Sequence, residues 1–191
     1  METTLKQTSN APKDLIKVVL FGPECTFKSS LAESLARHYN TVFVKEYSRD
    51  FTEAKAKGNQ KLDRADVLRI ARGQIKNENE QAQKANGLLI CDTDLLETLV
   101  YSKHYYDGFA PQELKKYALE NHYDLYFLTY IDTEWKADGI RDEPFKREEM
   151  FKKFEDALLQ AEKPYVILDG TFEKRLQTSI DHIDKLLDSK K

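Results

Sequence analysis

A glycine-containing loop joins an apolar run to an amphipathic stretch near the N-terminus. The run covers residues 15–21, and the loop and the helix start comprise Gly22, Pro23, Glu24, Cys25, Thr26, Phe27, Lys28, Ser29 and Ser30. A helix N-terminus offers free backbone N–H groups and the positive end of the helix dipole, so a loop there can surround a phosphate. The lysine neutralises phosphate charge, and the hydroxyl after it reaches Mg²⁺. The sequence therefore predicts a phosphate-binding loop in which Ser29 is a metal ligand, rather than an ordinary capped turn.

Phe27 departs from the usual pattern of such loops, G-x-x-x-x-G-K-[ST], because it stands at the second glycine. Glycine is the low-cost residue where a backbone needs a positive φ. Two outcomes follow from the sequence. Either the ring obstructs the approach of a phosphate, or it points away into the packing between helix and sheet and the loop still closes.

The rest of the chain alternates short apolar runs with longer stretches of helical period, which is the pattern of βα units around a parallel sheet. Strands are expected at residues 15–21, 41–45, 87–91, 124–130 and 165–168. Helices are expected at residues 64–85, with Leu68, Ala71 and Ile75 inward, and at 147–161, with Met150 and Phe154 inward. An α/β fold with five strands is the result.

Length and charge limit the classes of protein that this chain can form. Its 191 residues fit one domain, expected at residues 15–191 after a flexible polar tail at 1–14. A net charge of −3 gives no basic field for nucleic acid. There is no secretory signal at the start and no apolar run of the roughly 20 residues that cross a membrane. Because Cys25 and Cys91 lie far apart, no disulfide framework is expected, and the cytoplasm is the predicted location.

Two further groups of polar residues follow predicted strands. Asp92 ends the third strand, where a carboxylate can hold Mg²⁺ opposite the loop hydroxyl. Glu46, Tyr47 and Arg49 follow the second strand, beside the crevice where open α/β sheets bind ligands. Glu46 is a candidate to accept a proton from an attacking hydroxyl or to bind a sugar hydroxyl. A solvated surface pair of Glu46 and Arg49 is the competing interpretation.

Residues 131–146 break both the strand and the helix period and are predicted to form a loop or lid. This segment contains Trp135, Asp138 and Arg141. An arginine on a closing lid can stabilise charge on a transferred phosphoryl group, and the flat face of a tryptophan suits a cationic ring. The predicted roles are therefore catalysis for Arg141 and substrate binding for Trp135 and Asp138.

Five short motifs together resemble the nicotinamide riboside kinase domain of bacterial NadR-type proteins. They are FGPECTFKSSLA, VKEYSRDF, LLICDTD, WKADGIRD and VILDGTFEKR, and the resemblance spans about residues 16–187. It implies a P-loop kinase fold, with three αβα layers and a five-stranded parallel sheet. ATP and Mg²⁺ are then cosubstrates, and the γ-phosphate passes to the ribose 5′-hydroxyl of nicotinamide riboside.

The resemblance also implies a role for each matching residue. Gly22 to Ser30 bind the ATP phosphates, Ser29 and Asp92 hold Mg²⁺, and Lys28, Asp92, Arg141 and Glu46 form the catalytic set. The nucleoside contacts Glu46, Tyr47, Arg49, Trp135 and Asp138, while Asp169, Gly170 and Thr171 border adenine. Three alternatives stay open: a kinase for another nucleoside or small alcohol, a nucleotide-binding regulatory ATPase, and a scaffold without catalysis. The sequence does not fix an oligomeric state.

Overall fold

Five parallel strands form one sheet in the computed structural model, which describes residues 4–137 and 145–190. In chain order they are β1 (Ile16–Phe21), β2 (Phe43–Val44), β3 (Leu88–Asp92), β4 (Leu125–Thr129) and β5 (Tyr165–Leu168). Their order across the sheet is β2-β3-β1-β4-β5, and every neighbouring pair is parallel. β1 is therefore the central strand, and each of its residues is buried.

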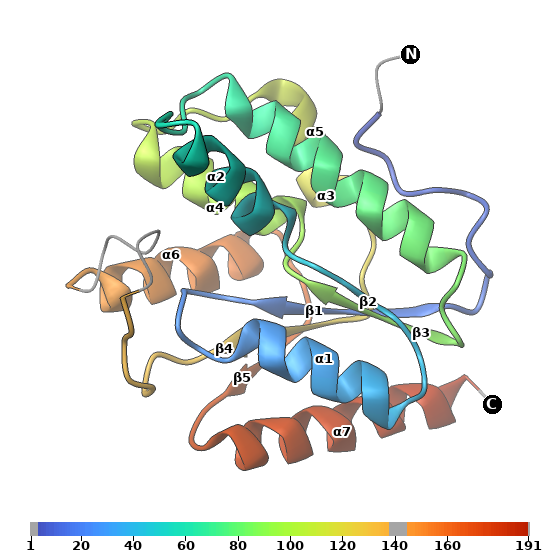
Figure 1. Ribbon diagram of the computed structural model, residues 1–191. Helices are drawn as coiled ribbons and strands as arrows, with labels where there is room; N and C mark the ends of the chain where they lie inside the picture. The colour runs from blue at the N-terminus through green and yellow to red at the C-terminus, as the bar shows by residue number, and fades with distance from the viewer. Residues whose placement is uncertain (1–3, 138–144, 191) are drawn as a thin grey trace.

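Helices cover both faces of the sheet, so the predicted three-layer α/β fold is confirmed (Figure 1). α1 (Lys28–His38) and α7 (Phe172–Ser189) pack on one face. The other face carries α3 (Asp66–Ala82), α4 (Leu95–Tyr105) and α6 (Arg147–Gln160). α2 (Tyr47–Lys57) and α5 (Gln112–Glu120) lie outside this second layer, against α3 and α4.

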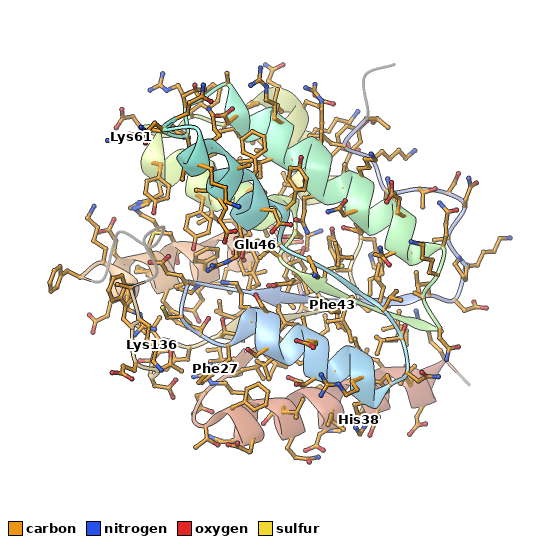
Figure 2. All side chains as sticks on the ribbon, viewed as in Figure 1. Phe27, His38, Phe43, Glu46, Lys61 and Lys136 are labelled. Atoms are coloured by element: carbon orange, nitrogen blue, oxygen red, sulfur yellow. The ribbon has the colours of Figure 1, made fainter. Side chains whose placement is uncertain are left out.

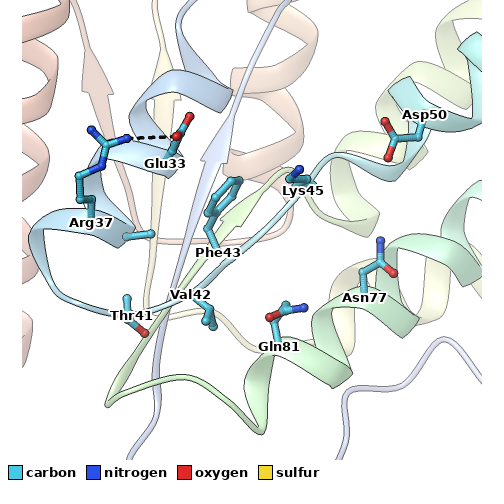
Figure 3. Close-up of a pocket in the computed structure, with 10 residues that line it drawn as sticks. Glu33, Arg37, Thr41, Val42, Phe43, Lys45, Asp50, Asn77 and Gln81 are labelled. Carbon is cyan, nitrogen blue, oxygen red and sulfur yellow. Dashed lines mark hydrogen bonds and ion pairs between the residues drawn. The ribbon is translucent and has the colours of Figure 1, made fainter.

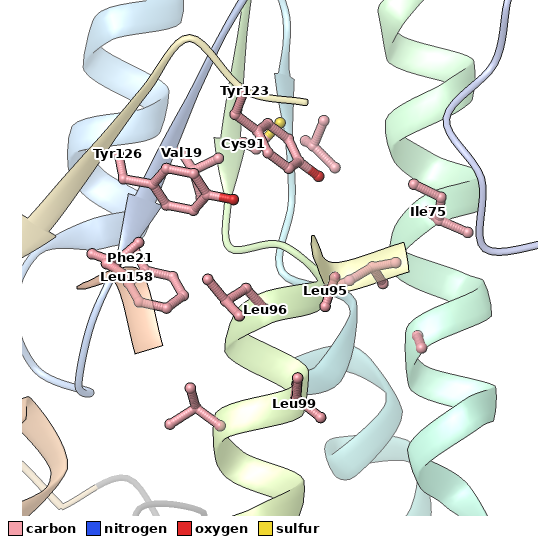
Figure 4. Packing of buried hydrophobic residues seen from close by; sticks show 14 of the residues in the cluster. Val19, Phe21, Ile75, Cys91, Leu95, Leu96, Leu99, Tyr123, Tyr126 and Leu158 are labelled. Atoms are coloured by element: carbon pink, nitrogen blue, oxygen red, sulfur yellow. The ribbon is translucent and has the colours of Figure 1, made fainter. Parts of the chain in front are cut away.

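Each face of the sheet has its own hydrophobic core, because parallel strands are apolar on both sides. Figure 4 shows the larger core, where Phe21 of β1 and Tyr126 of β4 meet leucines of α4. The ring of Phe21 makes edge contacts with Tyr126 at 5.5 Å and with Phe154 of α6 at 4.9 Å between centroids. The predicted inward position of Phe154 is confirmed.

The helix and strand boundaries differ from those predicted by the sequence pattern. β2 is only two residues long, and α3 is shorter at both ends than the expected 64–85. Leu68 is half-buried, because α3 turns Val67, Ile70 and Ala71 inward instead. The two-residue length of β2 follows from its place at the edge of the sheet, where one neighbour alone supports it.

Residues 4–14 contact the domain, in contrast to the loose tail that their polar composition suggests. Leu5 is completely buried in the larger core. The Gln7 side-chain amide donates to Glu78 at 2.7 Å, and the Gln7 backbone N–H donates to Asn121 at 3.3 Å. One buried leucine and these long-range hydrogen bonds hold the segment. Within the residues described, no helix combines the length and apolar character needed to cross a bilayer.

Candidate active site

The predicted polar residues converge because three parallel strands end side by side. Leu20 of β1 lies opposite Asp92 of β3, and Val44 of β2 lies opposite Cys91. The loop after β1, the end of β3 and Glu46 just after β2 therefore share one edge of the sheet. That edge is where parallel α/β sheets bind their ligands.

The loop between β1 and α1 closes tightly around its own backbone. Gly22 has φ +130°, and a Cβ at this position would lie 2.8 Å from the Thr129 hydroxyl, so only glycine fits. The Thr26 hydroxyl bonds the Pro23 carbonyl oxygen at 2.7 Å and the Thr129 hydroxyl at 2.6 Å. These contacts fix the loop against the end of β4.

Phe27 adopts the backbone conformation that glycine would adopt, with φ 70° at the N-cap of α1. Its side chain turns away from the loop, where it contacts Phe172 edge-on at 5.7 Å and lies 5.9 Å from the Arg175 guanidinium. Figure 2 places it on the α7 side of the sheet. The loop closes, as in the second outcome that the sequence left open, but the ring is 40% exposed beside the start of α7 and is not packed between helix and sheet. The cost is a left-handed conformation that is unfavourable for a residue with a Cβ.

Lys28 is buried at the start of α1 and binds back onto the loop. Its ammonium donates to the Gly22 carbonyl at 2.6 Å and to the Pro23 carbonyl at 2.9 Å, and its Nζ lies 3.5 Å from Oε1 of Glu97. Burial acts to lower the pKa of Lys28, but the carboxylates of Glu97, Glu46, Asp92 and Glu24 outweigh it and raise the pKa. Lys28 therefore stays charged.

Asp92 carries an unsatisfied oxygen at the centre of this cluster. The side chain accepts a hydrogen bond from Ser29, but its Oδ1 is buried without a partner among residues 4–137 and 145–190. Burial and the nearby Glu46 raise the pKa of Asp92 to about 6, against the opposing effects of Lys28 and Ser29. A buried carboxylate oxygen without a donor, beside a serine hydroxyl, fits a hard cation such as Mg²⁺.

A cavity of about 920 Å³ opens beside the loop. The loop forms one wall, and α2, α3 and α4 form the others. Its lining combines acidic side chains and tyrosines with basic side chains: Glu24, Glu46, Asp63, Glu97 and Glu134, then Tyr101, Tyr105 and Tyr106, and Lys28, Arg49, Lys61 and Lys136. Lys28 and Ser29 face the same space. The cavity is large enough for a small-molecule ligand.

The predicted residues after β2 divide between this cavity and the packing around it. Glu46 is the N-cap of α2 and accepts a hydrogen bond from the Ser48 hydroxyl at 2.5 Å, and Arg49 also lines the cavity. Tyr47 does not line it, because its ring packs directly over Gly73 of α3. The structure thus brings Glu46 and Arg49 to the site and turns Tyr47 toward α3.

Residues 131–137, the described first half of the predicted lid, lie against the phosphate loop. The Thr133 hydroxyl donates to the Cys25 carbonyl, and the Lys136 N–H contacts the Cys25 sulfur at 3.3 Å. The Trp135 indole N–H donates to Glu24 at 3.3 Å, and Trp135 is outside the cavity lining while its neighbours Glu134 and Lys136 are part of it. Asp138 and Arg141 lie outside the described residues.

The turn predicted to border adenine is not part of the cavity lining. Gly170 donates its N–H to Asp132 at 2.6 Å, Thr171 caps α7, and Asp169 pairs with Lys174 at 2.7 Å. The Phe27 ring reaches toward this turn through Phe172. The predicted adenine turn is therefore linked to the phosphate loop by the Phe27–Phe172 contact, and none of its three residues lines the cavity.

Glu97 is a member of the cluster that the sequence did not identify. The segment Asp94-Leu95-Leu96-Glu97 has the spacing of a helix-capping box, and the Asp94 carboxylate accepts the Glu97 N–H at 3.0 Å. The Glu97 side chain, however, turns to the phosphate loop, where it accepts the Gly22 N–H at 3.3 Å. The sequence pattern of Glu97 is explained by helix capping, so the pattern did not indicate that Glu97 belongs to the site.

A second hollow lies beside the edge strand β2, between α1 and α3 (Figure 3). Its volume is about 530 Å³, and its charged side chains are exposed. Glu33 and Arg37 pair with each other there at 3.1 Å. This hollow has no buried charge and lies away from the phosphate loop, so it is a poor candidate for an active site.

The fold and the loop define a class of nucleotide-binding domain. Residues 17–175 match the AAA domain family, and the chain belongs to that family. It also resembles the trifunctional NAD biosynthesis/regulator protein NadR of Escherichia coli (strain K12), with 31% identity over 125 residues. That match covers 65% of this chain and 30% of the relative, and NadR of Salmonella typhimurium matches over the same shares. The chain thus spans less than a third of the length of these curated relatives.

Solved structures give the same relationship. A crystal structure of NadR protein in complex with NR superposes with a TM-score of 0.76 and 26% identity, over 90% of this chain and 51% of that one. NadR in complex with NAD and AMP-PNP gives a TM-score of 0.72, at 26% identity, over 90% of this chain and 49% of that one. A deoxyadenosine kinase from M. mycoides shares the fold at 15% identity and a TM-score of 0.58, over 88% and 99% of the two chains. The resemblance to NadR-type proteins and the kinase-like P-loop fold are confirmed.

Proposed function

We propose that this protein is an ATP-dependent kinase that transfers the γ-phosphate of ATP to the ribose 5′-hydroxyl of nicotinamide riboside. The phosphorus–oxygen bond to the β-phosphate breaks, a bond to the 5′-oxygen forms, and the products are ADP and nicotinamide mononucleotide. The observation that carries the proposal is the position of Lys28 and Ser29, which lie in the wall of a cavity of about 920 Å³. The similarity to NadR in complex with NR supports nicotinamide riboside as the acceptor.

The loop residues Gly22 to Ser30 are proposed to bind the ATP phosphates, and Asp169, Gly170 and Thr171 to border adenine. Phosphoryl transfer depends mainly on positioning and on charge stabilisation, which backbone N–H groups and Lys28 would supply. Arg141 of the proposed lid would contact the transferred group. Glu46, at the rim between loop and cavity, would accept the proton that leaves the 5′-hydroxyl.

Ser29 and Asp92 are the residues that would hold Mg²⁺. The buried, unpartnered Oδ1 of Asp92 and the adjacent Ser29 hydroxyl fit this ion, which binds through few protein groups and the phosphates of its nucleotide. When bound, it neutralises charge on the phosphate oxygens. The protein's own part is to keep Asp92 in place at the end of β3.

The lining of the cavity favours a cationic acceptor. Acidic side chains and tyrosine rings attract a pyridinium ring through charge and through the face of the π system. Glu46 and Arg49 are placed to contact the nucleoside, and Asp138 and Trp135 are proposed to approach it from the lid segment. We expect no role for nucleic acid or a membrane, and we expect the reaction to take place in the cytoplasm.

The test measures ADP production from Mg-ATP with and without nicotinamide riboside, with neutral nucleosides and small alcohols as competing acceptors. Lys28→Ala is the blank, and Lys115→Ala, at an exposed lysine of α5, is its matched control. Turnover that depends on nicotinamide riboside and is lost only in Lys28→Ala would support the proposal. A preference for another acceptor would refute nicotinamide riboside as substrate and keep the kinase.

A nucleotide-binding regulatory ATPase is the second candidate, and the strained Phe27 favours it. A residue with a left-handed backbone in the phosphate loop is expected to weaken nucleotide binding. In that case Phe27→Gly raises nucleotide affinity, and no acceptor accelerates ATP turnover. Acceleration by nicotinamide riboside in the wild-type protein would exclude this candidate.

A further inference from the structure

Glu97 is a buried carboxylate that binds two parts of the phosphate loop at once. Its Oε2 accepts the Gly22 N–H at 3.3 Å, and its Oε1 lies 3.5 Å from Lys28 Nζ. The residue is 3% exposed and is held in the first turn of α4 by the Asp94 cap. The Glu97 side chain therefore links Gly22, at the start of the loop, to Lys28, at its end.

The ammonium of Lys28 has no donor left for another ligand in this arrangement. An ammonium group has three N–H donors. Two of them serve the carbonyls of Gly22 and Pro23, at 2.6 and 2.9 Å, and the third faces Glu97. A phosphate that binds to this loop must therefore replace at least one of these protein partners.

Glu97 is the partner with the greatest effect on a phosphate. Burial raises the pKa of Glu97, and the adjacent Lys28 opposes this rise and so favours the ionised carboxylate. The contacts of that carboxylate are a loop N–H and the loop lysine, which are the groups that a phosphate would use. Glu46 and Asp92 add negative charge nearby. In the nucleotide-free protein, the Glu97 carboxylate thus supplies the negative charge that the phosphates of a bound nucleotide would supply.

We propose that Glu97 is a positioning residue that holds Lys28 in a retracted position and so competes with the nucleotide phosphates for the loop. The empty protein is stabilised by the Lys28–Glu97 pair, and nucleotide binding must break it. Glu97 therefore sets the affinity of the site for nucleotide. The inference rests on phosphate binding by the loop and is independent of which acceptor the protein uses.

The test uses Glu97→Gln, which removes the negative charge of the side chain and keeps its shape. The amide oxygen can still accept the Gly22 N–H, but the attraction to Lys28 is reduced. We expect the melting temperature of the nucleotide-free protein to fall while AMP-PNP binds about five- to tenfold more tightly in calorimetry, which is the scale of one net hydrogen bond. A side chain with only a structural role would not raise affinity while lowering stability.

Glu78→Gln is the matched control. Glu78 is 1% exposed and lies 3.6 Å from the ammonium of Lys17, so it is a second buried Glu–Lys pair, and it lies outside the cavity lining. Its substitution is expected to lower the melting temperature and to leave AMP-PNP affinity unchanged. An equal gain in affinity in this variant would refute a specific role for Glu97.

The double variant Lys28→Met/Glu97→Gln separates release of the lysine from simple repulsion of phosphate. If Glu97 acts through Lys28, Glu97→Gln gives no gain in affinity when Lys28 is absent. A gain that persists in the Lys28→Met background would overturn the proposal, and so would unchanged or weaker binding in the single variant. Should Glu97→Gln fail to fold, Glu97→Asp keeps the charge but withdraws it by one methylene, and the same signs are expected.

Discussion

Lys28 and Arg175 are both buried cations, but the protein satisfies them in different ways. Arg175 is completely buried and donates to the carbonyls of Leu168, Gly170 and Tyr130, and it pairs with Asp132. Burial lowers the pKa of Arg175, against the opposing charge of Asp132. Its partners are mostly neutral carbonyls at the ends of β4 and β5.

Lys28, by contrast, lies among more carboxylates than it can neutralise. Glu97, Glu46 and Asp92 all act on it, and Asp92 keeps a buried oxygen without a donor. The Arg175 cluster is complete without a ligand, whereas the Lys28 cluster has an excess of negative charge. A complete cluster holds a fold together, and an incomplete one marks a place for a cation and a phosphorylated ligand.

The largest expected effect is on turnover in Lys28→Met. If Lys28 contacts the transferred phosphoryl group as proposed, the loss of its charge is expected to reduce kcat by about a hundred- to a thousandfold. Stability is expected to change less than in Arg175→Met, because Glu97 can take up a proton when its partner is removed: burial raises the pKa of Glu97 well above its usual value. Steady-state kinetics and urea denaturation measure the two quantities. Retained turnover would place Lys28 outside the catalytic set.

Arg175→Met is expected to lower the free energy of unfolding and to leave turnover nearly unchanged, which is the opposite of Lys28→Met. Removing the buried guanidinium takes one donor from each of three carbonyls and breaks the buried pair with Asp132, and the free energy of unfolding should fall by about 3 kcal/mol. Turnover of the remaining folded protein at low temperature should stay near the wild-type value. A loss of turnover at unchanged stability would mean that Arg175 acts in the site and that its role does not differ from that of Lys28.

Asp66 is a buried carboxylate whose partners, like those of Arg175, are all supplied by the protein. It is buried, and although burial opposes this, hydrogen bonds from Lys55 and the Asp63 N–H lower the pKa of its carboxyl. Its ionised form therefore contributes stability above the ordinary pKa of an aspartate, and this contribution is lost as pH falls through the lowered value.

The free energy of unfolding is expected to be about 1–2 kcal/mol higher in wild type than in Asp66→Asn at pH 7. This difference should shrink below about pH 4. Urea titrations at several pH values measure it, and Asp107→Asn, at an exposed side chain, is the control. A difference that is independent of pH would show that the Asp66 charge is not what its partners stabilise.

The smallest expected effect concerns Phe27. Phe27→Ala and Phe27→Gly both remove the contacts with Phe172 and Arg175, but only glycine relieves the positive φ. We expect the glycine variant to be more stable than the alanine variant by about 1 kcal/mol in urea denaturation. Equal stability would mean that the loop backbone rearranges when the ring is removed.

Much of the site could be predicted because it depends on local order in the chain. A strand, a glycine, a lysine and a helix in sequence are enough to place Lys28 and Ser29, and the end of an apolar run places Asp92. Tyr47 was predicted at the site with equal reason, yet a glycine on α3 gave its ring a packing surface. No periodicity of the sequence could show which side of α2 faces that glycine.

Glu97 marks the other limit of sequence reasoning. Its spacing from Asp94 has a complete explanation in local capping, so the sequence supplies no reason to look for a second role. Only the adjacency of β1 and β3 brings the first turn of α4 beneath the loop. The adjacency of β4 and β5, in turn, explains the buried Arg175 in the first turn of α7, which the pattern of that helix did not reveal.

The succession of strands and helices along the chain and the residue types of the phosphate loop could be predicted from local patterns, because hydrophobic period and turn chemistry act between near neighbours. Which charges meet depends on how the elements pack: Lys28 lies beside Glu97, Asp92 beside Ser29, and Arg175 beside Asp132. Electrostatic partners are chosen by distance in space, and burial then fixes how strongly they act.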